Sequence, residues 1–170
     1  FARNQVELTR GGLLLGGLTG GAFTVSDNDV VQHELERGLI VSGLTAITLT
    51  DNTFTRLGTP PGEAIALTLA PDDTPITATV TGNTFSGYTH ALHLAESATP
   101  EGLAATINGN VFDFTIDAAP KVADLENIKD QIDARDNQWG SNTSLATVES
   151  YVTLSGDTIT QGGSILLDPI

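Results

Sequence analysis

The sequence predicts an all-β fold: a right-handed parallel β-helix of about six coils, with an internal asparagine ladder and a short C-terminal cap. Two observations predict it. A motif of asparagine, any residue and an apolar residue recurs six times, and apolar residues alternate with polar ones before each copy. A short repeat of this kind buries its apolar face only by stacking on its neighbours, so we expect the repeats to form coils.

The asparagines set the repeat, and successive ones are 24, 24, 31, 27 and 27 residues apart. Asparagine tolerates the left-handed backbone conformation of a sharp bend, and its amide group both donates and accepts hydrogen bonds. We therefore expect a structural ladder along the stack rather than a row of ligand-binding amides. The ladder residues are Asn4, Asn28, Asn52, Asn83, Asn110 and Asn137.

Strands are expected on the N-terminal side of each asparagine. The residues three and five positions before it are apolar, and the residue between them is polar in most copies, as Thr48 and Thr79 illustrate. This alternation is typical of a strand with one buried face. A second alternation follows in most repeats, for example at Leu39 and Val41. The coils are predicted near residues 1–22, 23–46, 47–75, 76–102, 103–129 and 130–143 of a single domain spanning 1–170.

Aromatic residues follow the same register. Four of the seven Phe and Trp residues stand two positions after a ladder asparagine. Because equivalent positions of stacked coils lie above one another, these four are expected to form one aromatic stack in the core. They are Phe54, Phe85, Phe112 and Trp139.

Residues 117–130 depart from the strand pattern. Pro120 suits a first helical turn, and Val122, Leu125 and Ile128 follow at three-residue spacing. The segment is therefore predicted to be a short helix packed across the coil.

Residues 132–140, IDARDNQWG, resemble the last-coil motif, often DARNNWWG, of extracellular bacterial and archaeal β-helix repeats in the pectin-lyase-like superfamily. Gln138 stands where that motif often has a second tryptophan. The resemblance implies a helical cap at residues 144–152, a closing strand at residues 165–169 and a place outside the cell or on its surface. It implies little about function, because this architecture hosts both enzymes and inert stalks.

Charge narrows the range of partners. The chain has 21 acidic and 7 basic residues, a net charge of −14, so we expect neither nucleic acid nor an anionic membrane as a partner.

No apolar run approaches the roughly 18 residues that cross a bilayer. There is no cysteine, which excludes disulfides and thiolate sites. The chain begins with Phe1, already in ladder register, and we expect it to be processed from something longer.

Few side chains suggest chemistry. Asp27 and Asp51 precede ladder asparagines and Asp29 lies nearby, which makes these three carboxylates the candidate calcium site. Solvent-exposed turn caps are the alternative reading of them. The pair at positions 72–73 lacks a catalytic partner, and three histidines at positions 33, 90 and 93 do not suggest one metal site.

These observations favour a structural or surface-interaction module without catalysis, such as a stalk, an adhesin segment or a filament subunit that stacks head to tail. A polysaccharide-binding or polysaccharide-cleaving β-helix is the alternative, with Tyr88, Phe114 and Tyr151 as outward aromatic platforms. Ice binding is a third option. It would use outward threonines, although their columns look irregular in the sequence; examples are Thr48, Thr50, Thr77, Thr79 and Thr81.

Overall fold

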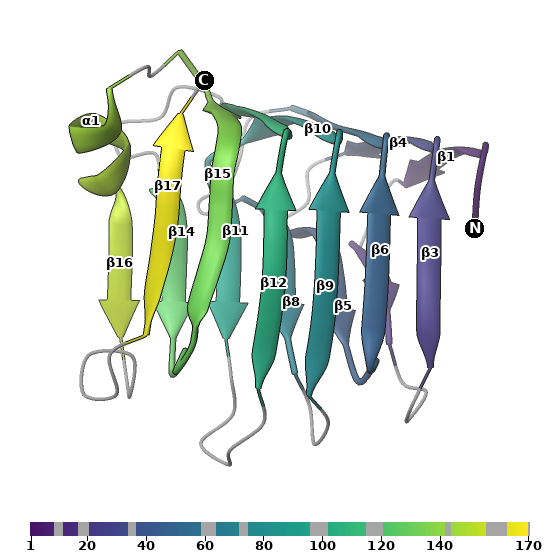
Figure 1. The fold of residues 1–170 in the computed structure, drawn as a ribbon. Helices are drawn as coiled ribbons and strands as arrows, with labels where there is room; N and C mark the ends of the chain where they lie inside the picture. The colour runs from purple at the N-terminus through teal and green to yellow at the C-terminus, as the bar shows by residue number, and fades with distance from the viewer. Residues whose placement is uncertain are drawn as a thin grey trace.

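The fold is a parallel β-solenoid whose strands line three long sides, as the computed structural model shows (Figure 1). It describes residues 1–8, 12–16, 21–33, 37–58, 64–71, 75–95, 102–114, 121–141, 144–155 and 163–169. Every pair of neighbouring strands is parallel, and each strand pairs with its counterpart in the next turn. Strands far apart in sequence thereby satisfy each other's backbone hydrogen bonds.

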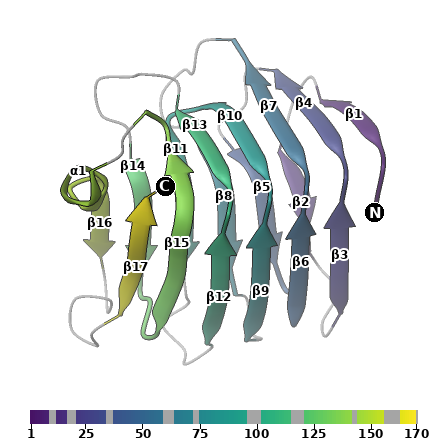
Figure 2. The same ribbon diagram turned by 45° about the horizontal axis from the view of Figure 1, so that its top comes forward.

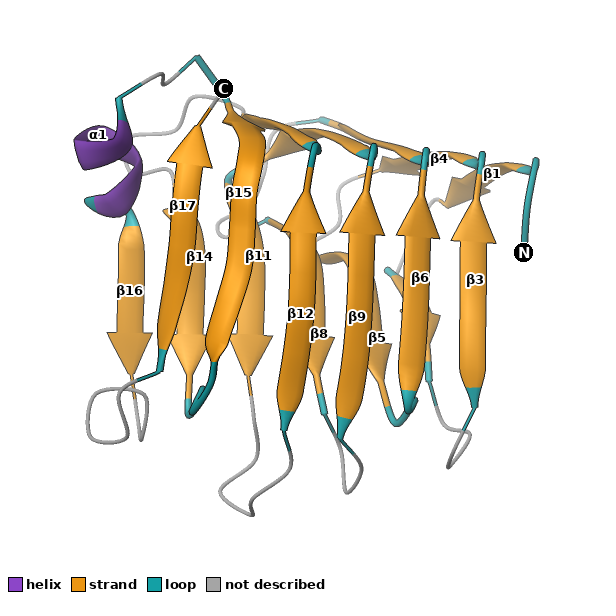
Figure 3. Cartoon of the chain, in the orientation of Figure 1, coloured by secondary structure: helices purple, strands orange, loops and turns teal. Residues whose placement is uncertain are grey.

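We call the three sides sheets A, B and C. Sheet A contains β3 (Ala22–Ser26), β6 (Ala46–Thr50), β9 (Ile76–Thr81), β12 (Leu103–Asn108), β15 (Gln131–Trp139) and β17 (Ser164–Pro169). Sheet B contains β1 (Gln5–Leu8), β4 (Asp29–His33), β7 (Thr53–Leu57), β10 (Thr84–Tyr88) and β13 (Val111–Phe114). Sheet C contains β2 (Leu13–Leu15), β5 (Arg37–Ser42), β8 (Ile65–Ala70), β11 (His90–Ala95), β14 (Lys121–Glu126) and β16 (Val152–Ser155). Figure 3 shows the strands of sheet A in front of those of sheet C.

The solenoid has about four turns, which corrects the six coils expected from the sequence. Each complete turn contributes one strand to sheets A, B and C, as β3, β4 and β5 do. The turn that starts at β12 and ends at β14 is the last complete one. Counting the six asparagines gives too many turns, because an asparagine marks only the corner between sheets A and B, whereas a complete turn requires all three sides.

Strand β15 joins two sides of the solenoid. Its N-terminal half pairs with β12 and β17 in sheet A, and its end pairs with β13 in sheet B, where Phe112 lies opposite Trp139. Sheets A and B are therefore continuous at this corner (Figure 2). The predicted closing strand is present as β17, and the predicted cap contains α1 (Leu145–Glu149).

The described part of the predicted helix at 117–130, residues 121–130, contains a strand and no helical turn. Residues 121–126 form β14, which pairs with β11 on one side and β16 on the other. Backbone hydrogen bonding to both neighbours requires an extended chain. Val122, Leu125 and Ile128 are all fully buried. Their three-residue spacing therefore reflects burial on a strand and the turn after it, and not the face of a helix.

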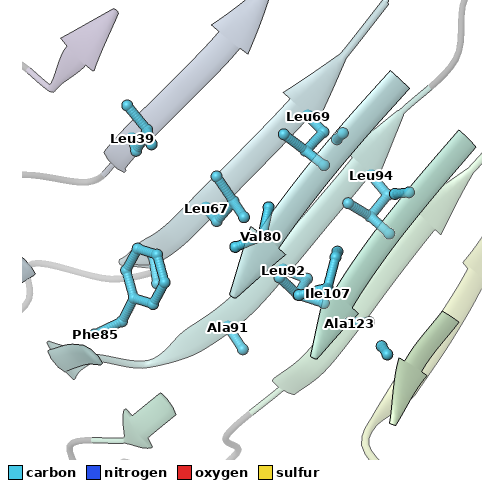
Figure 4. Packing of buried hydrophobic residues seen from close by; sticks show 14 of the residues in the cluster. Leu39, Leu67, Leu69, Val80, Phe85, Ala91, Leu92, Leu94, Ile107 and Ala123 are labelled. Carbon is cyan, nitrogen blue, oxygen red and sulfur yellow. The ribbon is translucent and has the colours of Figure 1, made fainter. Parts of the chain in front are cut away.

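The core fills the space between the three sheets with stacked apolar columns. On sheet C, Leu39, Leu67 and Leu92 lie at paired positions of successive strands, and all three are fully buried (Figure 4). Val80 and Ile107 are paired in the same way on sheet A. Inward positions are thus devoted to packing, and function must reside on the outward positions or in the turns.

Candidate surface-binding face

The predicted ladder asparagines lie inside the molecule at the corner between sheets A and B. Each side-chain Nδ2 donates to the Oδ1 of the next asparagine, over 2.8–3.0 Å. The same Oδ1 also accepts a hydrogen bond from the backbone N–H of the preceding asparagine: the Asn52 N–H, for example, donates to Asn83 Oδ1 at 3.0 Å. From Asn28 to Asn137 these side chains are at most 2% exposed. The predicted ladder is confirmed, and its amides are occupied by one another.

The left-handed conformation belongs to the residue before each ladder asparagine, not to the asparagine itself, which corrects the sequence prediction. These residues have φ between 55° and 68°, and they are Arg3, Asp27, Asp51, Gly82, Gly109 and Asp136. The division has a physical reason. The left-handed residue makes the bend, and the asparagine side chain then turns inward to bond the carbonyl oxygens that the bend leaves free, as Asn83 does with the oxygens of Leu49 and Thr81.

The four predicted aromatic residues form a parallel stack. The ring centroids of Phe54, Phe85, Phe112 and Trp139 are 5.0, 5.1 and 4.9 Å apart in that order, with interplanar angles of 5–6°. This spacing follows from the strand separation of about 4.8 Å. All four side chains are at most 1% exposed, so they stabilise the core and are not available to a ligand.

The other predicted site residues do not come together. Among the described residues, no three His, Asp or Glu side chains converge into a group that could hold a metal ion. Asp27, Asp29 and Asp51 are described and form no such group, so the calcium hypothesis has no three-carboxylate donor set. His90 is buried with its Nδ1 2.8 Å from the Thr89 hydroxyl. The acidic pair at 72–73 lies outside the described residues.

Of the three predicted aromatic platforms, Tyr88 is not an outward ring. Tyr88 is 1% exposed, and its hydroxyl donates to the Gln32 side-chain oxygen. Burial raises the pKa of the Tyr88 phenol, and the charge of Arg56 opposes that rise. Tyr151 is half-buried against the core, and the side chain of Phe114 lies outside the described residues.

Among the described residues, the outward side of sheet A carries a regular surface, whereas the pairing of β10 with β13 in sheet B shifts register between Ser86 and Tyr88. Across β3, β6, β9 and β12 the strands pair without a register shift, so outward residues form straight columns. We call these twelve residues the threonine face. Its columns are Ala22, Ala46, Thr77 and Ala104; Thr24, Thr48, Thr79 and Thr106; and Ser26, Thr50, Thr81 and Asn108.

The threonine face has a composition unlike that of the whole chain. Seven of its twelve residues are threonine and none is charged, in a chain with a net charge of −14. All twelve side chains are exposed or partly exposed. The columns are regular, contrary to the irregularity expected from the sequence. Figure 1 looks directly onto the four strands, which lie side by side with nearly parallel axes.

A charged pair ends the threonine face at β15. Asp133 continues the column of Thr106, and its carboxylate accepts two hydrogen bonds from Arg135, at 2.9 Å from Nε and 2.8 Å from Nη2. These bonds lower the pKa of Asp133 to about 2 and raise the pKa of Arg135. Both groups therefore stay ionised over the physiological range, and the neutral face stops at this strand.

Sheet B presents a different surface. An open groove on its outer side is lined by Gln5, Val6, Glu7, Asp29, Val31, His33 and Leu57. His33 Nε2 lies 3.0 Å from a carboxylate oxygen of Glu7, and Leu57 is 44% exposed. The groove mixes charged and apolar groups with no repeat, so it does not share the order of the threonine face.

Sequence reasoning identified five of the seven face threonines as a group but missed their order. The signal that identifies the whole face is the number of residues between each outward position and the next ladder asparagine in the sequence. Residues four positions before the asparagines at 28, 52, 83 and 110 are all threonine, and residues two positions before them are Ser26, Thr50, Thr81 and Asn108. Counting back from each asparagine removes the effect of unequal loops.

No protein-family model, curated protein or solved structure matches the chain. The parallel β-solenoid therefore stands on the strand pairing itself, and the resemblance of residues 132–140 to extracellular repeats stays a prediction. Among the described residues, no helix is long and apolar enough to cross a membrane.

Proposed function

We propose that this chain is a non-catalytic surface-interaction module, outside the cell or on its surface, that presents the threonine face to an extended, uncharged partner. The observation that carries the proposal is the unbroken register of four strands whose outward residues are small, neutral and mostly threonine. We also propose that the solenoid winds right-handedly, because parallel crossover connections almost always do.

The scaffold supports this role through rigidity. Directly beneath the threonine face lie buried residues such as Val25, Leu49 and Val80, and the ladder fixes the corner beside it. Threonine is β-branched and has few side-chain rotamers. A face held in this way loses little conformational entropy when it binds, which favours recognition of a flat and ordered surface.

The charge contrast supports an uncharged partner. The twelve residues of the threonine face contain no charge, while the chain as a whole is strongly acidic. A cation-rich surface would be bound through carboxylates, which the threonine face lacks. An anionic surface would be repelled by the acidic chain. A neutral solid, such as ice or a crystalline polysaccharide, avoids both difficulties.

Co-sedimentation with neutral solids tests the proposal. The wild-type chain is expected to bind at least one of ice, crystalline cellulose and crystalline chitin in 0.15 M salt, and Thr79→Tyr is expected to lose that binding because a bulky ring protrudes from the flat face. Thr53→Tyr, on the outer side of sheet B, is the matched control and should bind as the wild type does. Equal binding by Thr79→Tyr, or no binding to any of the three solids, would contradict the proposal.

Head-to-tail stacking of copies stays a prediction. Sizing of the wild-type protein by light scattering, on the samples used for co-sedimentation, separates it from surface binding. A strictly monomeric particle that still binds a solid would exclude filament formation as the basis of that binding.

A further inference from the structure

We infer that the solid recognised by the threonine face is ice. The inference rests on the proposed function and specifies its partner. It draws on the two-dimensional repeat of the face, on the chemistry of its side chains and on the absence of charge among its twelve described residues.

The spacing across the strands suits an ice lattice. Neighbouring strands are about 4.8 Å apart, so the paired residues Thr24, Thr48, Thr79 and Thr106 repeat at that interval. Water oxygens in ice are joined by O–H···O bonds of about 2.75 Å at tetrahedral angles, which places second neighbours about 4.5 Å apart. Over the three intervals between four strands the mismatch reaches only about 1 Å.

The side chains suit water in an ordered array. Each threonine offers a hydroxyl that donates and accepts and a methyl group that water surrounds without bonding. Within the part of the chain that the structure describes, no protein group bonds the hydroxyl of Thr48 or Thr79. These hydroxyls are available to lattice water. The absence of charge matters here because an ionised group orders its own hydration shell and would disturb the lattice beside it.

A crystalline polysaccharide fits these observations less well. Sugar rings are commonly bound by outward aromatic side chains combined with directional polar groups in a concave site. The twelve residues of the threonine face include no aromatic ring, and they lie on four strands that run side by side with nearly parallel axes (Figure 1). Tyr88, the strongest aromatic candidate in the sequence, is buried.

Ice-crystal growth measured in a nanolitre osmometer tests the inference. The wild-type chain is expected to shape ice crystals and to open a gap between the freezing and melting temperatures. Thr79→Tyr and Thr106→Tyr should both lose that gap, because each ring lifts the face from the lattice. Thr53→Tyr should keep it. Circular dichroism and melting temperature establish that each variant is folded, and two separate face variants keep the test valid if one of them does not fold.

The outcomes separate the inference from the proposed function. No effect of the wild-type chain on ice, together with polysaccharide binding that Thr79→Tyr abolishes, would overturn ice as the partner and leave the threonine face as a binding surface. An effect on ice that survives both face variants would overturn the threonine face itself. No binding to ice or to polysaccharide would overturn both.

Discussion

Asn83 illustrates at the scale of one residue why the ladder holds. Its Oδ1 accepts both the backbone and side-chain N–H groups of Asn52, at 3.0 and 2.9 Å, and its Nδ2 donates to Asn110 at 3.0 Å. The side chain is fully buried. Replacing it with alanine leaves several buried groups without partners.

Asn83→Ala is expected to lower the free energy of unfolding by about 1–3 kcal/mol, the usual cost of unsatisfied buried polar groups. Urea titration followed by circular dichroism measures it. Asn108→Ala is the matched control, because Asn108 is an outward residue of the neighbouring strand end and is only partly buried. Equal losses in the two variants would show that the ladder bonds add nothing beyond a surface asparagine.

A pair of glycines separates backbone strain from steric overlap. Gly87 and Gly109 both have positive φ, at 82° and 67°. A Cβ at Gly87 would overlap the carbonyl oxygen of Arg56, whereas a Cβ at Gly109 would meet no atom within 4 Å. Gly109→Ala should therefore cost about 1–2 kcal/mol through strain alone, and Gly87→Ala distinctly more. Thermal unfolding of the two variants ranks them, and a smaller loss at Gly87 would refute this account.

The element scale is governed by register. Phe85 lies between Phe54 and Phe112 in the aromatic stack, with β7 and β13 on either side of β10. Removing the central ring therefore weakens packing in three successive turns. Leucine fills part of the same space and keeps an apolar side chain there.

Phe85→Ala is expected to cost about 3–5 kcal/mol in unfolding free energy, and Phe85→Leu considerably less, because the cost grows with the cavity left behind. Denaturant titrations of both variants and of the wild type supply the comparison. If the leucine and alanine variants were equally destabilised, stacking geometry rather than cavity volume would dominate at this position.

Register also explains what could be predicted from the sequence. The ladder and the aromatic stack were predictable because each turn has one place for a buried asparagine and one for a ring. The ring follows its asparagine by two residues in each case, whatever the length of the loops elsewhere in the turn. Strand β14 was mistaken for a helix because Val122, Leu125 and Ile128 are buried by neighbours that only the pairing reveals. The order of the threonine face was missed because a 31-residue interval precedes Asn83, which hides the columns until the ladder is used as the origin.

At the scale of the whole molecule, net charge opposes the compact state. The chain of 170 residues has a net charge of −14, so its excess carboxylates repel one another at low ionic strength. Salt shortens the screening distance to about 3 Å at 1 M, so the repulsion weakens without any change of contact.

The melting temperature is therefore expected to rise as sodium chloride increases from 10 mM to about 1 M. Sucrose serves as the control, since it stabilises compact states without screening charge. A melting temperature that is constant or falls with salt would contradict the argument. Calcium chloride at matched ionic strength tests the calcium hypothesis in the same assay: a rise beyond that of sodium chloride would support a bound ion.

The stacking of equivalent positions also makes the length of the molecule adjustable in whole steps. Thr84 pairs with Thr53 and Phe85 with Phe54, so the backbone after Asn83 occupies the same place in its turn as the backbone after Asn52. Excising residues 53–83 would join two equivalent points of the backbone and shorten the solenoid by one turn. Every remaining strand would still lie beside a matching partner. Duplicating that segment would lengthen the solenoid by one turn and widen the threonine face by one strand. Evolution can thus change the reach of such a molecule without redesigning its interior.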